Sequence, residues 1–346
     1  MRTFDYQNLP SKLFSGKVSA ANVRVYEDKG KLDQLRQTHG AELEALREQA
    51  HFDNVDASTR IEGLYAQPGR TQELLEGAEP ADEMEQQILG YSNALRLVEE
   101  QGNDLGLSTS SILALYEALY GYRDLGRKSR YRKKDYLYVQ VDGHPQAMPV
   151  SPITAFETPL VLGGACDSLA EAFASDSCSP LISNAVFTVD FLCIRPFDEG
   201  NGRISRLFSD LMLMTAGFDI ARFVSIDRIA ESSAMDYYNA LNACVEKWDR
   251  GMNDYEPFVL YWLELVHQAY LRLFDRVNAS SGHKAGKTER VMLAVQRAGK
   301  PVSKREIKAL LPDVSEATIE AALGKLVKDG AVQKLGAGRA TTYQWL

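Results

Sequence analysis

The chain has 346 residues, a length that suits two or three packed units. Its apolar content of 45% and charged content of 25% are ordinary for a globular protein, and no apolar run approaches the roughly 18 residues of a membrane span. The net charge of −8 is uneven, because residues 284–346 hold 12 Lys and Arg against 6 Asp and Glu, a net of +6, which leaves −14 for the rest. An acidic body with a basic tail suggests that the tail has a separate task.

Two further absences narrow the class of protein. The first residues, MRTFDYQNLP, lack the basic-then-apolar pattern of a secretion signal. The cysteines show neither the density of a disulfide scaffold nor CxxC metal spacing; they are Cys166, Cys178, Cys193 and Cys244. We therefore expect a cytoplasmic protein with reduced thiols and no membrane partner.

Helical patterns dominate the chain up to about residue 280. Apolar residues recur at three-to-four spacing, which predicts helices, in the segments 31–50, 81–101 and 108–122. A Ser-Pro pair indicates the start of a helix over 179–194. A further helix over 204–217 is expected to end at Gly217 as its C-cap.

Two segments depart from this pattern. In 135–150, apolar residues flank an Asp-Gly pair at 142–143, which predicts a β-hairpin. The segment 278–287, NASSGHKAGK, has the composition of a linker. After it the sequence predicts a helix, a short helix, a longer helix and two strands with glycines at their tip, which together indicate a winged helix-turn-helix.

The stretch IRPFDEGNGRISR, residues 194–206, combines glycines, a carboxylate and arginines. We expect a new helix to begin near Gly202, so that backbone amides at its N-terminus form an anion site. Glu199 is suited to a hard cation such as Mg²⁺, which commonly bridges phosphates. Arg203 and Arg206, three residues apart, share one face of the new helix. The stretch therefore predicts a site for a polyphosphate with its metal ion.

This stretch resembles the signature of the Fic family, H-x-F-x-[D/E]-G-N-G-R-x-x-R. Seven of the eight fixed positions are present: Phe197, Glu199, Gly200, Asn201, Gly202, Arg203 and Arg206. The eighth position, a histidine in the family, is Arg195. The resemblance covers most of residues 1–280 and implies an all-α fold, a Fic-type helical bundle with a small β-hairpin flap, followed here by the winged helix.

The resemblance also implies a division of the chain into three regions. We expect an N-terminal helical region, a Fic core and a winged-helix domain, over 1–100, 101–280 and 281–346. Within them we expect an inhibitory helix, a flap and the motif at about 54–64, 131–150 and 195–206.

The segment STRIEG matches the family's inhibitory helix pattern, [S/T]-x-x-x-E-[G/N], through Ser58, Glu62 and Gly63. The resemblance implies that Glu62 pairs with Arg206 and stops this arginine from gripping the γ-phosphate of ATP, so that ATP binds in an unproductive pose. We therefore expect the two side chains to be in contact in the resting protein.

The resemblance assigns further contacts to a protein target and to the nucleotide. The exposed edge of the hairpin would hold a target segment that carries a hydroxyl side chain, by strand addition. The cofactors implied are ATP and Mg²⁺, with the metal on Glu199. The residues expected at the nucleotide are Tyr136, Leu137, Tyr138 and Val139 of the flap and Glu199, Gly200, Asn201, Gly202, Arg203, Ile204, Ser205 and Arg206 of the motif.

The roles of a tyrosine pair and of two histidines, and the oligomeric state, have alternative interpretations. Tyr237 and Tyr238 stand where related proteins bring tyrosines against the nucleotide, and core packing is the equal alternative. His51 and His144 are expected to be surface or turn residues rather than catalytic bases. A homo-oligomer is compatible with the sequence.

Arg195 changes what the motif can do. Fic proteins of this kind transfer AMP from Mg-ATP to a protein hydroxyl, and the family's histidine takes the hydroxyl proton. Such general-base help is worth roughly a hundredfold to ten-thousandfold. Arginine cannot accept a proton at neutral pH. The sequence therefore predicts nucleotide binding together with weak or lost AMP transfer.

Three hypotheses follow for the function. In the first, the protein binds nucleotide and acts as a sensor or regulator through its winged helix. In the second, it removes AMP from proteins, with Glu62 activating water while Arg195 stabilises phosphate charge. In the third, Arg195 is a variant in an otherwise competent adenylyltransferase.

The tail carries its own alternatives. A winged helix with net charge +6 is typical of DNA binding, which would make the protein a transcriptional regulator. However, Glu316 and Glu320 lie on the expected recognition helix, where they would meet phosphates or base edges. Several basic residues lie outside that helix: Lys300, Lys304, Arg305, Lys308, Lys334 and Arg339. A structural or dimerising winged helix is the equal alternative.

Overall fold

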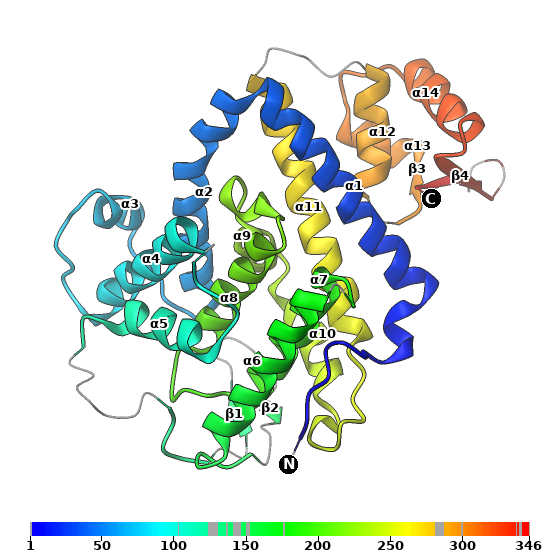
Figure 1. The fold of residues 1–346 in the computed structure, drawn as a ribbon. Helices are drawn as coiled ribbons and strands as arrows, with labels where there is room; N and C mark the ends of the chain where they lie inside the picture. The colour runs from blue at the N-terminus through cyan, green and yellow to red at the C-terminus, as the bar shows by residue number, and fades with distance from the viewer. Residues whose placement is uncertain are drawn as a thin grey trace. The chain divides into compact units, whose positions relative to one another are not determined.

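The computed structural model describes residues 2–102, 104–123, 131–135, 138–140, 147–149, 153–175, 177–280, 287–298, 300–336, 338 and 341–345. The chain forms two compact units, Met1–Tyr270 and Leu271–Leu346 (Figure 1). All four cysteines are free thiols, as expected. Within the described ranges, no helix combines the length and the apolar character that crossing a bilayer requires.

The first unit is built almost entirely of helices, which confirms the all-α prediction. Those that begin in it are α1 (Gly16–Thr38), α2 (Gly40–Ile61), α3 (Arg70–Leu75), α4 (Glu83–Gln101), α5 (Thr109–Tyr120), α6 (Thr158–Ser175), α7 (Pro180–Ile194), α8 (Asn201–Thr215), α9 (Ile226–Ser232), α10 (Ala234–Val245) and α11 (Glu256–Ser280). Short 3₁₀ helices cover Ser11–Phe14, Asp219–Arg222 and Trp248–Arg250.

The predicted helix over 31–50 is wrong in one respect, because the chain breaks at His39 into two helices. His39 has φ −132° and ψ 37°, outside the helical range, and α2 begins at the next residue. Figure 1 shows α1 and α2 meeting at a sharp bend. Apolar residues continue at helical spacing on both sides of the break, so the periodicity alone could not indicate it.

Helix α7 lies at the centre of the first unit. Every residue from Leu181 to Ile194 is buried, because the run carries almost no polar face. Asp190, on this helix, is 1% exposed and accepts hydrogen bonds from Tyr6 Oη, Trp248 Nε1 and Tyr255 Oη at 2.6–2.7 Å. Helix α7 packs against α6 and α8, and α8 in turn packs against α4 and α5. The loop between α7 and α8 is therefore anchored to the core at both ends.

His51 is not a surface residue, contrary to the expectation. It is 3% exposed on α2 and lies between two side chains of α4. Its Nε2 is 2.9 Å from Ser92 Oγ, and its Nδ1 is 2.9 Å from Glu99 Oε2. Packing of α2 on α4 buries the ring, and the local sequence does not show which helix will cover it.

The predicted hairpin is present where strands are described. β1 (Tyr138–Gln140) and β2 (Ala147–Pro149) are antiparallel, with Val139 opposite Met148. The turn at 142–143, together with Tyr136, Leu137 and His144, lies outside the described residues.

The second unit has its own small core and sheet. Its elements are α12 (Lys287–Arg297), β3 (Val302–Ser303), α13 (Lys304–Leu310), α14 (Glu316–Lys328), β4 (Val332–Leu335) and β5 (Thr342–Trp345). The strands form an antiparallel sheet of order β3-β5-β4. A capping box between Ser303 and Glu306 starts α13, and the side chain of Ser315 caps α14. The expected three helices and two strands are present, and β3 is an addition that the sequence did not indicate.

Candidate functional site

The loop between α7 and α8 is held in shape by its own residues. The Asn201 side chain accepts from Phe197 N at 3.0 Å and donates to Phe197 O at 2.9 Å. The Phe197 ring is fully buried and stacks on Tyr116 with centroids 4.1 Å apart. Arg195 caps α7 in the left-handed region, with φ 46°. These bonds fix the N-terminus of α8 relative to α7, so its free amide groups point to a defined place.

Two glycines of the motif lie where an added side chain would meet a neighbouring side chain. Gly200 has φ +76°, and a Cβ there would lie 2.8 Å from Tyr120 Oη. A Cβ on Gly202 would lie 2.2 Å from Glu62 Oε1. The missing side chain at position 202 therefore lets the Glu62 carboxylate approach the first turn of α8, where the amide groups and the helix dipole favour a negative charge.

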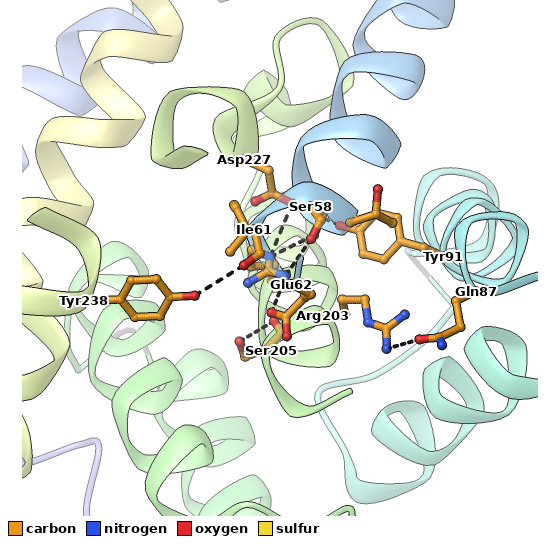
Figure 2. Close-up of polar contacts among 12 residues, drawn as sticks. Ser58, Ile61, Glu62, Gln87, Tyr91, Arg203, Ser205, Asp227 and Tyr238 are labelled. Atoms are coloured by element: carbon orange, nitrogen blue, oxygen red, sulfur yellow. Dashed lines mark hydrogen bonds and ion pairs between the residues drawn. The ribbon is translucent and has the colours of Figure 1, made fainter. Parts of the chain in front are cut away.

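Arg206 is the centre of the contacts between α8 and the end of α2. Figure 2 shows Ser58 and Glu62 from this end of α2 among the polar contacts of the site. Its Nη2 donates to Glu62 Oε1 at 2.8 Å and to Ser58 O at 3.0 Å, and its Nε donates to Ser58 Oγ at 2.8 Å. The side chain is 7% exposed. The expected contact between Glu62 and Arg206 is therefore present, and Ser58 adds two further bonds to the same guanidinium. Gly63 follows in the left-handed region, with φ +79°, and ends the helix.

A second carboxylate, which the sequence did not suggest, also faces Arg206. Asp227 Oδ2 on α9 lies 3.6 Å from Arg206 Nε and accepts from Tyr91 Oη on α4 at 3.0 Å. Burial raises the pKa of Asp227, and the charge of Arg206 opposes that rise. Neither residue belongs to a recognisable local pattern, so only the fold brings them to the site.

The Glu62 carboxylate is surrounded by positive charge. Burial alone would raise its pKa, but the guanidinium groups of Arg206, Arg203 and Arg195 outweigh burial and lower the pKa below its ordinary value. Glu62 is therefore ionised at neutral pH. Arg195, where the family carries histidine, adds a permanent cation to this group.

Arg203 is hydrogen-bonded to neighbours on α4 and α5. Its Nη2 donates to Gln87 Oε1 at 2.8 Å and to Tyr120 Oη at 2.7 Å, and the residue is 4% exposed. Its Nε and Nη1 are buried and have no partner among the described residues. A buried guanidinium with free donors at a helix N-terminus is suited to a further anion.

The remaining motif residues differ in what they face. Ile204 is fully buried and packs in the core. The Ser205 hydroxyl donates to Gly202 O at 2.8 Å and so stays within its own helix. Either residue can offer only its backbone to a ligand at the helix start.

Glu199 is the candidate metal ligand, on a loop where both Asp198 and Glu199 are exposed. Its side chain is 44% exposed and pairs with Arg123, which also pairs with Glu83. Among the described residues there is no cluster of three or more side chains that could hold a metal ion. An exposed loop carboxylate such as Glu199 fits Mg²⁺, which is commonly held by one or two carboxylates together with phosphate oxygens and water.

The tyrosine pair lies next to the end of α2. Tyr237 is 6% exposed, and its ring meets that of Tyr238 edge-on at 5.3 Å. The Tyr238 hydroxyl lies 3.5 Å from Ile61 O (Figure 2). Burial raises the pKa of Tyr237 to about 12, so its hydroxyl stays protonated. Of the four flap residues expected at the nucleotide, Tyr138 and Val139 lie on β1, and the other two are outside the described residues.

Comparison with known proteins shows what part of the chain is similar to. Residues 106–213 match the Fic/DOC family. The chain is 25% identical over 265 residues to the protein adenylyltransferase Fic of Drosophila grimshawi, covering 72% of this chain and 50% of that protein. It is 24% identical over 254 residues to the protein adenylyltransferase fic-1 of Caenorhabditis briggsae, covering 71% and 45%. The chain thus spans about half the length of the curated relatives it matches.

Solved structures share the fold. A Fic family protein from Desulfovibrio desulfuricans G20 is similar with a TM-score of 0.58 at 20% identity, covering 94% of this chain and 96% of that one. Fic-1 (aa134–508) from C. elegans is similar with a TM-score of 0.58 at 20% identity, covering 78% and 76%. At this level of identity the likeness concerns the fold.

Proposed function

We propose that this chain, a Fic family protein, binds Mg-ATP at the start of α8 and is held in an inhibited state by Glu62. The observation that carries the proposal is the set of bonds from Arg206 to Glu62 and Ser58. They occupy the guanidinium that would otherwise meet a terminal phosphate. ATP then loses its best partner at the γ-phosphate and is expected to bind in a pose that does not lead to transfer.

The rest of the loop supports a nucleotide ligand. The first-turn amides of α8, the lack of a side chain at Gly202, where an anionic group already lies, and the free donors of Arg203 suit phosphate oxygens. Glu199 would hold Mg²⁺, which neutralises phosphate charge when bound. The protein's own task is to fix the phosphate chain relative to the hairpin, whose strands offer an edge to a target segment.

The curated relatives' names describe protein adenylyltransferases, and in this chain we expect transfer of AMP to a protein hydroxyl to be weak or lost. Attack of a hydroxyl oxygen on the α-phosphate breaks the bond to pyrophosphate and releases the hydroxyl proton. Arg195 stands where the family places a histidine, and a guanidinium has no lone pair that accepts this proton. The position adds positive charge for binding and does not add a base.

The test compares the unaltered chain, Arg195→His, Glu62→Gly and the double variant with labelled ATP and Mg²⁺. The proposal expects nucleotide binding by all four and strong AMP incorporation only in the double variant. Strong labelling by the unaltered chain would show that another group takes the proton. Absence of nucleotide binding by every variant would overturn the proposed function as a whole.

Removal of AMP from proteins is a second candidate, and the charge state of Glu62 favours it. A lowered pKa leaves this carboxylate ionised at neutral pH and able to accept a proton from water. The same lowering makes it a weaker base. Release of AMP from an AMP-modified protein, abolished by Glu62→Gln, would establish this reaction.

We infer that the second unit is a winged helix that contacts DNA weakly, through phosphates. Two of its basic side chains already have internal partners, since Lys304 pairs with Glu320 and Lys308 donates to Val314 O at 2.6 Å. The helix α14, expected to enter a groove, exposes Glu316 and Glu320. This arrangement favours backbone contact over base reading.

A further inference from the structure

Helix α9 is joined to the last turns of α2 by an ion-pair network on the outer side of both helices. Arg228 donates from Nη2 to Asp56 Oδ2 and from Nη1 to Glu231 Oε2, both at 2.6 Å. Arg60 donates from Nε to Glu231 Oε1 at 2.7 Å. Asp53 Oδ1 lies 3.8 Å from Arg228 Nη2 and adds charge to the same group. We call Asp53, Asp56, Arg60, Arg228 and Glu231 the α2–α9 network.

The network spans the part of α2 that carries the inhibitory residues. Asp56 and Arg60 are four residues apart and share one face of α2, on either side of Ser58. Glu62 comes after the last helical residue, with φ −89°, and is followed by Gly63 with φ +79°. Terminal helical turns fray unless other contacts hold them. The position of Glu62 therefore depends on what fixes the last two turns of α2.

Neighbouring residues of α9 act on opposite sides of this helix end. Asp227 is 5% exposed and faces Arg206, whereas Arg228, the next residue, has a side chain that is 30% exposed and faces Asp56. One short helix thus meets the inhibited arginine on its inner side and the inhibitory helix on its outer side. A shift of α9 relative to α2 would change both the contact of Asp227 with Arg206 and that of Arg228 with Asp56.

We propose that Arg228 is a positioning residue that keeps Glu62 on Arg206 by clamping the end of α2 to α9. This inference rests on the proposed function, because it concerns the same inhibitory contact. Arg228 has the central place in the network, since it alone bonds carboxylates on both helices. The carboxylates it meets are 15–23% exposed, so the network is shielded from solvent more than an ordinary surface pair.

The consequence concerns how the inhibition is released. Loss of the clamp lets the last turns of α2 fray, and Glu62 then spends part of its time away from Arg206. The freed guanidinium gains access to a terminal phosphate, which ATP has and ADP lacks at the same position. Loss of Arg228 is therefore expected to strengthen ATP binding and to leave ADP binding nearly unchanged.

The experiment measures ATP and ADP affinity by isothermal titration calorimetry with Mg²⁺ for the full chain, Arg228→Gln, Glu62→Gly and the double variant. We expect Arg228→Gln to raise the preference for ATP over ADP by about threefold to tenfold, as for the loss of one partly buried ion-pair group. In the Glu62→Gly background, Arg228→Gln should have no further effect, because the residue acts through Glu62. Arg228→Lys, which keeps the charge, should restore most of the original preference.

Arg70→Gln is the matched control. Arg70 also bonds two carboxylates, Glu73 and Glu85, has a side chain that is 23% exposed, and lies on α3, outside the α2–α9 network. Arg70→Gln should leave the preference for ATP over ADP unchanged.

If Glu62→Gly raises ATP affinity and Arg228→Gln does not, the proposed clamp is overturned while the proposed function stands. If Glu62→Gly itself has no effect, both are overturned. If Arg228→Gln does not fold, Glu231→Gln, which removes the carboxylate bonded by Arg60 and Arg228, is tested instead and should raise the preference for ATP in the same way.

Discussion

Glu62 and Arg206 are joined by a hydrogen-bonded ion pair of 2.8 Å between residues 144 positions apart in the chain. The pair lies over the first turn of α8, in the space left open by Gly202. The carboxylate occupies the place that a phosphate oxygen would take at a helix N-terminus. The protein therefore carries its own anion at the site where we propose that nucleotide binds.

Removing that anion should strengthen ATP binding. Glu62→Gly frees Arg206 for the terminal phosphate, while Asp227 remains as its counter-ion. We expect ATP affinity to rise by about tenfold, equivalent to about 1.4 kcal/mol, with a smaller change for ADP. Calorimetric titration of both nucleotides in the presence of Mg²⁺ checks the prediction. Equal gains for ATP and ADP would show that Arg206 does not meet the γ-phosphate.

Introducing a base at position 195 should restore AMP transfer. In the Glu62→Gly background, Arg195→His supplies an acceptor for the hydroxyl proton, and AMP transfer should rise by roughly a hundredfold to ten-thousandfold. The measurement is incorporation of labelled AMP into the protein itself or into lysate proteins. Arg195→Gln in the same background is the control, since it removes the charge without adding a base, and it should stay near background. Equal activity of the glutamine and histidine variants would contradict the assignment of a base to position 195.

The same ion pair should contribute to stability in a defined pH range. The pKa of Glu62 is lowered in the folded protein, so its contribution is present above the unfolded pKa and is lost as pH falls through the folded pKa. Glu62→Gln should therefore lower the Tm at pH 7 by about 2 °C, and the difference should shrink as the pH falls below the ordinary glutamate pKa of about 4.3. Thermal melts monitored by circular dichroism across this range give the answer. A Tm difference between the two proteins that grows on acidification would contradict the predicted pH dependence.

The contribution of Asp210 to stability should have the opposite pH dependence. Burial, followed by the nearby charge of Asp227, raises its pKa well above the ordinary value. A raised carboxyl pKa means that stability is present at low pH and is lost as pH rises above the unfolded value. Asp210→Asn does not titrate, so its Tm relative to the unaltered chain should increase from pH 4 to pH 8. Asp254→Asn is the control, because the pKa of Asp254 is lowered and its loss should reduce the Tm at neutral pH.

The second unit should bind DNA with strong salt dependence and little sequence preference. The exposed basic residues of α14, Lys325 and Lys328, lie in its last turn, and others lie outside this helix, which favours phosphate contacts. Affinity measured by fluorescence anisotropy should fall by about tenfold or more between 50 and 200 mM salt. Duplexes of unrelated sequence should bind alike. Tight binding to one duplex that is lost on single base changes would instead indicate a sequence-specific regulator.

The sequence by itself determined several helices, the anion-binding motif and the expected partner of Glu62. Apolar spacing and capping residues predicted α4, α5, α7 and α8, because helix formation depends on side chains three to four positions apart and on local end groups. The motif Arg195–Arg206 indicated an anion site, since glycines, a following helix start and arginines lie within one short stretch. The resemblance of STRIEG to an inhibitory segment led to the expectation that Glu62 meets Arg206, and this contact is present.

Other features were decided only by the tertiary structure. Asp227, Tyr91 and Arg228 come from helices separated in the chain, and their meeting with Arg206 and Asp56 depends on how α9 and α4 pack against α2 and α8. The burial of His51 has the same origin, because another helix covers it. The break at His39 left the apolar spacing intact on both sides. Local pattern determines which residues form a helix, whereas the partners of a polar side chain depend on contacts between distant segments that no short pattern encodes.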